Sequence, residues 1–291
     1  MSQEKDFDVV VVGSCNLDLV STTSHLPTAG ETLVSLDYAE HAGGKGLNQA
    51  VASARMGART AFIGCVGNDS AGSMLRETLE LEGIDTSQLI TVDAPTGRAF
   101  ITVDSKGENT IVIVPGANSY VVAASFTLPS ASVVLAQLEI PLTTVLHVFT
   151  QARHSGAITV LNPAPAAQLS DTLLAMCDIV VPNETESEAL GGTAHLLHAG
   201  AITVITTLGA RGAEITDANS TVSITPTQVR TIDTVGAGDA FVGALCAELS
   251  RGQEIQLAAQ TASIAGALAT TIRGAVPSLP TRDAVTQHQA I

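Results

Sequence analysis

Short apolar runs alternate along most of the chain with segments whose apolar residues recur every three or four positions. The runs predict strands buried on both faces, and the intervening segments predict amphipathic helices. The predicted strands cover 8–12, 60–66, 132–138, 157–161, 178–181 and 202–206. The predicted helices cover 47–55, 70–82, 141–154, 194–199 and 240–249. Repeated alternation of strand and helix predicts an α/β protein built on a parallel sheet.

Three further segments have a different pattern and predict a small side sheet. Residues 31–40 alternate loosely between apolar and polar positions, as an exposed strand does. Residues 98–103 and 110–114 are strand-like and are joined by Asp-Ser-Lys-Gly-Glu-Asn, which has the chemistry of a hairpin turn. We expect these strands to be inserted in the alternating α/β pattern.

The composition indicates a globular protein with enough chain for a large core. The 291 residues are 45% hydrophobic and 14% charged, which suits one large domain or two small ones. The net charge of −15 argues against a general attraction for nucleic acid or for an anionic membrane. Any phosphate group must therefore be held by local groups.

The N-terminal residues and the cysteines predict a cytoplasmic protein. Residues 1–6 are polar and acidic, unlike a signal peptide, and no apolar run approaches the roughly 20 residues that span a bilayer. The four cysteines are scattered without a C-x-x-C pair, so we expect reduced, buried thiols.

The segment from Asp233 to Phe241 (DTVGAGDAF) contains the most informative polar residues. Gly236 and Gly238 allow backbone N–H groups to approach a ligand, and Asp239 precedes an apolar helix. At the N-cap or in the first turn, Asp239 would lie beside unpaired N–H groups that can hold an anion. The same residues also fit a glycine-rich turn with an aspartate N-cap.

Two other polar segments suit a small polar ligand. Asn16 and Asp18 follow the first strand and point the same way in extended chain, which suits the hydroxyls of a polyol. An Asx-type turn is the alternative. Three glycines surround Lys45 before a helix, but Gly46 stands where a Walker A loop needs Ser or Thr. Lys45 and Asn48 therefore either contact a ligand or belong to a solvated loop.

These motifs together resemble the ribokinases of the PfkB family of carbohydrate kinases over about residues 8–281. Asp233 to Leu245 (DTVGAGDAFVGAL) resembles the C-terminal signature of the family, and Gly43 to Asn48 (GGKGLN) resembles its N-terminal signature. The strings at 162–165 (NPAP) and 182–186 (PNETE) resemble ribokinases more narrowly. The resemblance implies a single doubly wound α/β unit over 1–291. It also implies a β-sheet lid from about 14–43 and 96–115, through which the family forms homodimers.

The resemblance also implies roles for individual residues in the sugar and phosphate sites. Asp239 would be the general base, and the loop of Gly236, Ala237 and Gly238 would cradle the transferred phosphoryl group. The residues that would hold the sugar hydroxyls are Asn16, Asp18, Gly44, Lys45, Asn48 and Glu139.

ATP, Mg²⁺ and K⁺ are the cofactors that the resemblance implies. Asn183 would lie near the phosphates of ATP, Ser263 near its base, and Glu186 would position Mg²⁺ through water together with Asn183. The loop that would line the nucleotide consists of Thr207, Leu208, Gly209, Ala210, Arg211 and Gly212. The positions similar to ligands of the monovalent cation are Asp233, Val235, Ala269, Ile272, Gly274 and Ser278.

We expect ATP-dependent phosphorylation of D-ribose at its 5-hydroxyl. A related kinase of the family that acts on deoxyribose or a nucleoside is the nearest alternative. Asn16 is the discriminating residue, because an amide there suits a sugar with a 2-hydroxyl. A sugar-binding protein without turnover is a further alternative, which the presence of Asp239 disfavours. The segment 188–201 is shorter than is usual in ribokinases, which leaves the preferred phosphate donor open.

Overall fold

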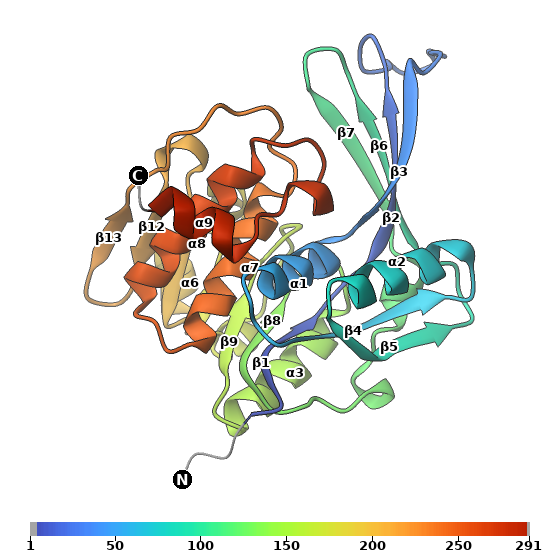
Figure 1. Cartoon of the computed structure of the whole chain (residues 1–291). Coiled ribbons are helices and arrows are strands. Elements are labelled where there is room, and N and C mark those ends of the chain that lie inside the picture. Colours follow the sequence, from blue (N-terminus) through green and yellow to red (C-terminus); the bar gives the residue numbers. More distant parts are fainter. Residues whose placement is uncertain (1–4, 290–291) are drawn as a thin grey trace.

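The computed structural model describes residues 5–289, within which the strands form two sheets (Figure 1). The larger sheet has nine strands in the order β13-β12-β11-β10-β9-β8-β1-β4-β5. Its strands are β1 (Phe7–Val12), β4 (Thr60–Gly67), β5 (Asp85–Val92), β8 (Ala131–Ala136), β9 (Ile158–Leu161), β10 (Ile179–Val180), β11 (Thr203–Thr207), β12 (Ala213–Thr216) and β13 (Thr221–Ile224). The pairs from β11 to β5 are parallel, and β12 and β13 extend the sheet as antiparallel strands. The predicted parallel α/β sheet is confirmed.

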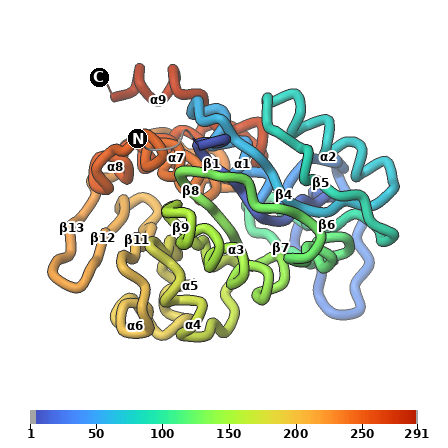
Figure 2. Tube along the Cα trace, turned by 90° about the horizontal axis from the view of Figure 1, so that it is seen from below, coloured from blue at the N-terminus to red at the C-terminus, as the bar shows by residue number. Residues whose placement is uncertain are grey.

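Helices cover both faces of this sheet (Figure 2). One face carries α1 (Lys45–Arg55), α2 (Ser70–Leu81), α7 (Ala237–Ser250), α8 (Ile255–Ala269) and α9 (Arg282–Gln289). The other carries α3 (Leu142–His154), α4 (Asp171–Leu174), α5 (Glu184–Ala189) and α6 (Thr193–His198). Short 3-10 turns lie at Gly116–Tyr120, Ala123–Ser125, Gly209–Arg211 and Val276–Ser278.

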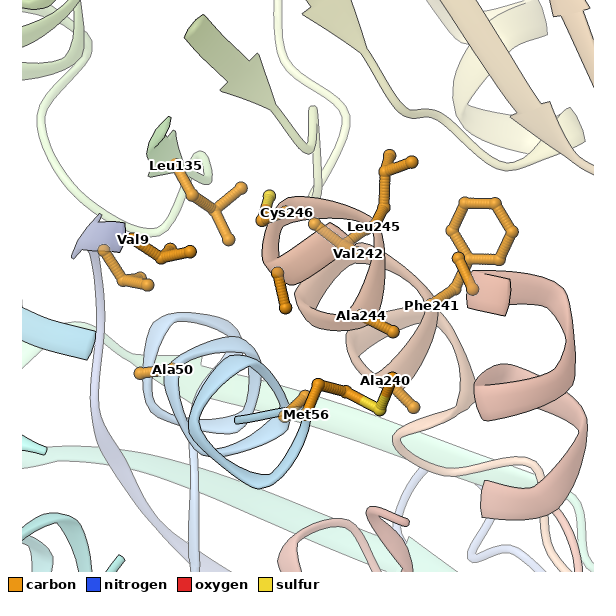
Figure 3. Close-up of a cluster of buried hydrophobic side chains, with 14 of the residues drawn as sticks. Val9, Ala50, Met56, Leu135, Ala240, Phe241, Val242, Ala244, Leu245 and Cys246 are labelled. Carbon is orange, nitrogen blue, oxygen red and sulfur yellow. The ribbon is translucent and has the colours of Figure 1, made fainter. Parts of the chain in front are cut away.

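The continuous apolar strands divide their side chains between two cores. In β1, Val9 and Val11 belong to the core under α1, α7 and α8, while Val10 and Val12 belong to the core under α3. On the first face, Val9 and Leu135 of the sheet point toward α7 (Figure 3). Alternate burial on both faces explains why the strand is apolar at every position.

The smaller sheet has the order β3-β2-β6-β7 and projects from the main body (Figure 1). Its strands are β2 (Asn16–Thr22), β3 (Asp37–Gly43), β6 (Gly97–Val103) and β7 (Asn109–Val114). The predicted hairpin is confirmed, because β6 pairs with β7 from Arg98–Val114 to Val103–Asn109. All four strands fall within the segments expected to form a lid.

The strand predicted at 31–40 was wrong in its position. Residues 31–36 lie outside any strand, and β3 starts at Asp37 and runs through Gly43. Glu31 instead accepts hydrogen bonds from the backbone and hydroxyl of Thr28. The register with β2, which was not predicted as a strand, selects residues 37–43. Loose alternation could not reveal this partner.

Strands β5, β12 and β13 were also not predicted. The prediction of buried, unpaired thiols at Cys15, Cys65, Cys177 and Cys246 is confirmed. No helix in the part of the chain that the structure describes is both long and apolar enough to cross a membrane.

Candidate active site

Asp239 lies in the first turn of α7 and points into the protein. The helix begins at Ala237, three residues earlier than predicted, so the N-cap is Gly236 in the left-handed conformation. The expectation of a first-turn aspartate is confirmed, and the alternative of an aspartate N-cap is wrong. No side chain caps α7. Its first turn therefore keeps N–H groups available to an anion, although Ala237 N–H reaches the Thr234 carbonyl at 3.3 Å.

The helices α1 and α7 cross in close contact at Gly243. A Cβ at Gly243 of α7 would overlap the Cβ of Ala52 and lie 2.7 Å from the Gln49 carbonyl of α1. Ser53 donates a hydrogen bond across the same crossing to the Gly243 carbonyl at 3.1 Å. Because Gly243 has no side chain, α1 packs close enough to α7 for polar side chains of α1 to reach Asp239.

Two amides of α1 hold the Asp239 carboxylate. Asn48 Nδ2 donates to Oδ2, and Gln49 Nε2 donates to Oδ1, both at 2.9 Å. Gln49 also donates to Asn162 Oδ1 at 2.9 Å and accepts from Gln137 Nε2 at 2.6 Å. Asp239 is therefore buried in a polar network rather than exposed on a turn.

Asn16, Asp18 and Glu139 meet at the base of the smaller sheet, where the chain passes from the larger sheet into β2. Glu139 Oε2 accepts from Ser14 Oγ, from Asn16 Nδ2 at 3.5 Å and from the Lys45 N–H at 3.3 Å. Asn16 is oriented by Asn118, whose amide donates to Asn16 Oδ1 at 2.7 Å. This grouping has both donors and acceptors, as a ligand with several hydroxyls requires.

Asp18 carries the perturbed carboxyl of the site. Burial, together with the nearby charges of Glu139 and Asp239, raises the pKa of Asp18 to about 7. The Asp18 side chain lies over Gly43, where any Cβ would overlap the carboxylate. Three acidic groups therefore share this end of the site.

Two neighbouring cavities open beside the α7 N-terminus. The first, about 230 Å³, is lined by Lys45, Asn183, Glu186, Gly236 and Asp239 among others. The second, about 280 Å³, is lined by Ala237, Phe241 and Ser263 among others. Thr207, Thr234 and Gly238 line both cavities. The carboxylate of Asp239 is thus adjacent to a boundary between two ligand-sized spaces.

The structure brings most of the residues predicted for the nucleotide to the second cavity. Thr207, Gly209, Ala210 and Gly212 line it together with Gly238 and Ser263. Leu208 and Arg211 do not, and Arg211 instead forms an exposed ion pair with Glu184. The prediction that Leu208 and Arg211 line the nucleotide therefore has no support in the cavity lining. The short segment 188–201 lies outside both cavities.

Asn183 and Glu186 form a capping box at the start of α5. Asn183 Oδ1 accepts from the Glu186 N–H at 2.8 Å, and Glu186 Oε2 accepts from the Asn183 N–H at 2.9 Å. The pair therefore has a structural role in addition to its place in the first cavity. Within residues 5–289, no cluster of three His, Cys, Asp or Glu side chains is placed to hold a metal ion.

Asp233 joins two loops behind the α7 N-terminus. Its carboxylate accepts from the N–H of Gly274 at 2.9 Å and of Val235 at 3.1 Å. A Cβ at Gly236 would lie 3.5 Å from Ser278 Oγ, so the second loop also packs against this glycine. Ala269 is buried at the end of α8, beside Thr270, whose carbonyl accepts from the Asp233 N–H. Ile272 is exposed on the surface of that loop.

The sequence over residues 6–282 matches the family described as pfkB family carbohydrate kinase. The chain belongs to this family. It is similar to a ribokinase of Staphylococcus aureus, with 39% identity over 96% of this chain and 98% of that protein. The crystal structure of ribokinase from Thermotoga maritima superposes with a TM-score of 0.90 at 34% identity, covering 98% of this chain and all of that one. A structure of Arabidopsis thaliana ribokinase complexed with ribose and ATP has a TM-score of 0.86 at 30% identity, covering 98% and 99% of the two chains.

The carbohydrate-kinase family therefore accounts for the fold, which is the ribokinase-like α/β architecture with its smaller second sheet. Several residues of this kinase were missed from the sequence, above all Gln49, Gln137 and Asn162. Gln49 is a polar residue next to the apolar run Ala50 to Ala52, which was a usable signal, since a buried amide must find partners. Gln137 lies near the end of one predicted strand and Asn162 directly follows another, and only the sheet order brings them to Gln49.

Proposed function

We propose that the chain phosphorylates D-ribose at its 5-hydroxyl with ATP, giving D-ribose 5-phosphate and ADP. The observation that carries this proposal is the place of Asp239, whose carboxylate lines the first cavity while the adjacent Gly238 lines both. The similarity to the S. aureus ribokinase and to the Arabidopsis structure with ribose and ATP supports the choice of substrates.

In this proposal the sugar lies between the smaller sheet and Asp239. Asp18, Asn16 and Glu139 offer acceptors and donors to its hydroxyls, together with Gly44, Lys45 and Asn48. ATP lies in the 280 Å³ cavity, whose apolar floor around Phe241 and Ala267 suits a base. Ser263 lies along the same wall.

The transfer step requires a base and a positive environment for the phosphoryl group. Asp239 takes the proton of the 5-hydroxyl, that oxygen bonds to the γ-phosphorus, and the bond from phosphorus to the β-phosphate oxygen breaks. The electron pair leaves with ADP. The N–H groups of Ala237 and Gly238 face the growing negative charge, and donors of this kind contribute about 3–4 kcal/mol in comparable sites.

The residues present fit the two cations that we propose. Mg²⁺ would be held through water by Asn183 and Glu186, which supply oxygen atoms beside the first cavity. A monovalent cation would be held by the loops that Asp233 joins, with Val235, Ala269, Ile272, Gly274 and Ser278. Both cations supply positive charge near the transferred group.

We also propose that the smaller sheet is a lid and a dimer contact. Its edge strand β7 exposes apolar side chains on both faces, with Val112 64% and Ile111 53% exposed. The register places Ile113 on the same face as Ala99 and Asp18, next to the sugar site. A second copy of this chain would cover this apolar surface. Sedimentation of V112E and I111E tests the contact, and a dimer for both variants contradicts it.

ADP release over a panel of pentoses, deoxyribose and nucleosides, with and without K⁺, tests the proposed reaction. We expect the highest kcat/KM for ribose, with activation by K⁺. A preference for deoxyribose or a nucleoside would replace ribose as substrate, and binding of sugar without ADP release would indicate a sugar-binding protein.

The variant D239N tests the role of the base. Asn48 can turn its amide over to accept from the new amide, because Asn48 Oδ1 has no partner within the described residues. We therefore expect folding and substrate binding to persist while kcat falls about 10²–10⁴-fold. Turnover near that of the wild type would contradict the assignment.

A further inference from the structure

The Gln49 amide has a single possible orientation in the network around Asp239. Both of its N–H groups are used, by Asp239 and by Asn162, and its oxygen accepts from Gln137. Asn162 is oriented in turn, because its Nδ2 donates to the Val181 carbonyl at 2.9 Å. Turning the Gln49 amide over would break all three of its hydrogen bonds.

The groups behind Gln49 come from the frame of the larger sheet. Gln137 directly follows β8, Asn162 directly follows β9, and Val181 directly follows β10. Gln49 and Gln137 are both 0% exposed. Gln49 therefore ties the Asp239 carboxylate to the carboxyl ends of three adjacent strands.

The second partner of Asp239 is less constrained. Asn48 Oδ1 has no hydrogen-bond partner within residues 5–289, so among the described residues only the contact with Asp239 orients that amide. The two contacts thus differ. The Gln49 amide, which donates to Asp239 Oδ1, is fixed by further hydrogen bonds, whereas the Asn48 amide, which donates to Oδ2, can turn over.

We propose that Gln49 is a positioning residue for the base, and that Gln137 and Asn162 serve to keep its amide turned toward Asp239. This inference rests on the proposed function, because it assigns Asp239 the task of taking a proton. The physical reason is that a displacement of about 1 Å at a reacting group can cost on the order of 10²-fold in rate. A side chain fixed by three buried hydrogen bonds prevents such a displacement.

The variant Q49M removes the amide while keeping most of the side-chain volume. We expect kcat to fall about 10–100-fold, with the KM values for sugar and ATP within about threefold of the wild type. The matched control is S53A, one turn further along α1, which removes a hydrogen bond to α7 without touching Asp239. Its kcat should stay within about twofold of the wild type even if its Tm falls as much as that of Q49M. Equal kcat values for Q49M and S53A would overturn the proposal.

A double-mutant cycle with D239N separates positioning from general damage to the fold. If Gln49 acts through Asp239, the kcat of Q49M/D239N equals that of D239N. A further loss of 10-fold or more in the double variant would overturn the proposal.

The partner Gln137 provides a graded test further from the reaction. Q137M leaves the Gln49 oxygen without its donor, and we expect a kcat loss of about 3–10-fold, smaller than for Q49M. A larger loss of kcat for Q137M than for Q49M would contradict the proposal that Gln137 acts on Asp239 through Gln49.

A crystal structure of Q49M gives a readout that does not depend on turnover. We expect the Asp239 carboxylate to rotate away from its wild-type position or to occupy two rotamers. An unchanged, single carboxylate position would overturn the proposal even if the wild type phosphorylates ribose. A wild type that phosphorylates no sugar would instead refute the proposed function, whatever that structure shows.

Discussion

The Asp18 carboxylate occupies the space that a side chain at Gly43 would need. The two residues lie on adjacent strands, β2 and β3, and a Cβ at position 43 would overlap Oδ2, Cγ and Oδ1 of Asp18. Gly43 is therefore required by a neighbouring side chain rather than by its own backbone angles. This relationship connects a residue of the N-terminal glycine signature to the predicted sugar site.

The variant G43A should consequently lose sugar affinity with little loss of stability. The atoms in the way belong to the end of a flexible side chain, so Asp18 can rotate aside at small cost. We expect the sugar KM to rise 10-fold or more, with the ATP KM unchanged, in steady-state assays. The contrasting variant is G44A, whose Cβ would lie 2.8 Å from the Asn16 backbone nitrogen at a φ of 91°. G44A should lower the Tm, and equal Tm losses for both variants would contradict this distinction.

Asp18 should also make stability depend on pH. Its pKa is raised by burial and by Glu139 and Asp239 to about 7 in the folded protein, against an ordinary value of 3.8. Well below the ordinary pKa of 3.8 the group is neutral in both the folded and the unfolded state, so it does not lower stability. As the pH rises toward 7, the unfolded chain ionises first, so the folded state loses stability. The variant D18N has no ionisable group at this position and therefore does not lose this stability.

We therefore expect the free energy of unfolding of D18N to exceed that of the wild type increasingly from about pH 4 to pH 7, and the difference to level off above pH 7. The gain at pH 8 should be on the order of 1–3 kcal/mol, measured by urea unfolding without sugar. A difference between the two proteins that does not change with pH would contradict the raised pKa.

Glu186 allows the structural and cation roles of its motif to be separated. A glutamine at the third helical position completes a capping box as glutamate does. E186Q should therefore keep its Tm within about 1 °C while needing several-fold more Mg²⁺ for half-maximal activity. N183A removes the cap itself and should lose about 0.5–2 kcal/mol in unfolding free energy. An unchanged Mg²⁺ requirement in E186Q would remove Glu186 from the cation site.

Gly243 should matter for both stability and turnover because it sets the distance between α1 and α7. Alanine normally stabilises a helix relative to glycine, but here its Cβ would overlap Ala52 and approach the Gln49 backbone. We expect G243A to lose about 1–3 kcal/mol and to lower kcat, since Gln49 and Asp239 move apart. At Gly266 of α8 the tightest contact would be 3.1 Å, to the Ala237 carbonyl, so G266A should cost less. The opposite ranking in urea unfolding would contradict this reading of the crossing.

Much of the architecture could be predicted because local pattern determines it. The continuous apolar stretch at Val9 to Val12 can only be buried on both faces, which indicates a parallel sheet between helix layers. The glycines before Asp239 indicated an anion site, and the structure places them on a cavity wall. These features depend on residues close together in sequence, so neighbouring positions carry the information.

Pairing between distant segments was decided by the tertiary structure alone. The sequence of residues 31–43 permitted more than one strand, and the ladder from Asn16–Gly43 to Thr22–Asp37 selected residues 37–43. The same holds for the network around Asp239. Its residues come from α7 (Asp239), from α1 (Gln49) and from the ends of β8 (Gln137) and β9 (Asn162). Their hydrogen bonds form because sheet order and the α1–α7 crossing bring these elements together, a constraint that no local pattern contains. The sequence by itself thus determined the chemical groups of the site, and the packing decided which groups hold one another in place.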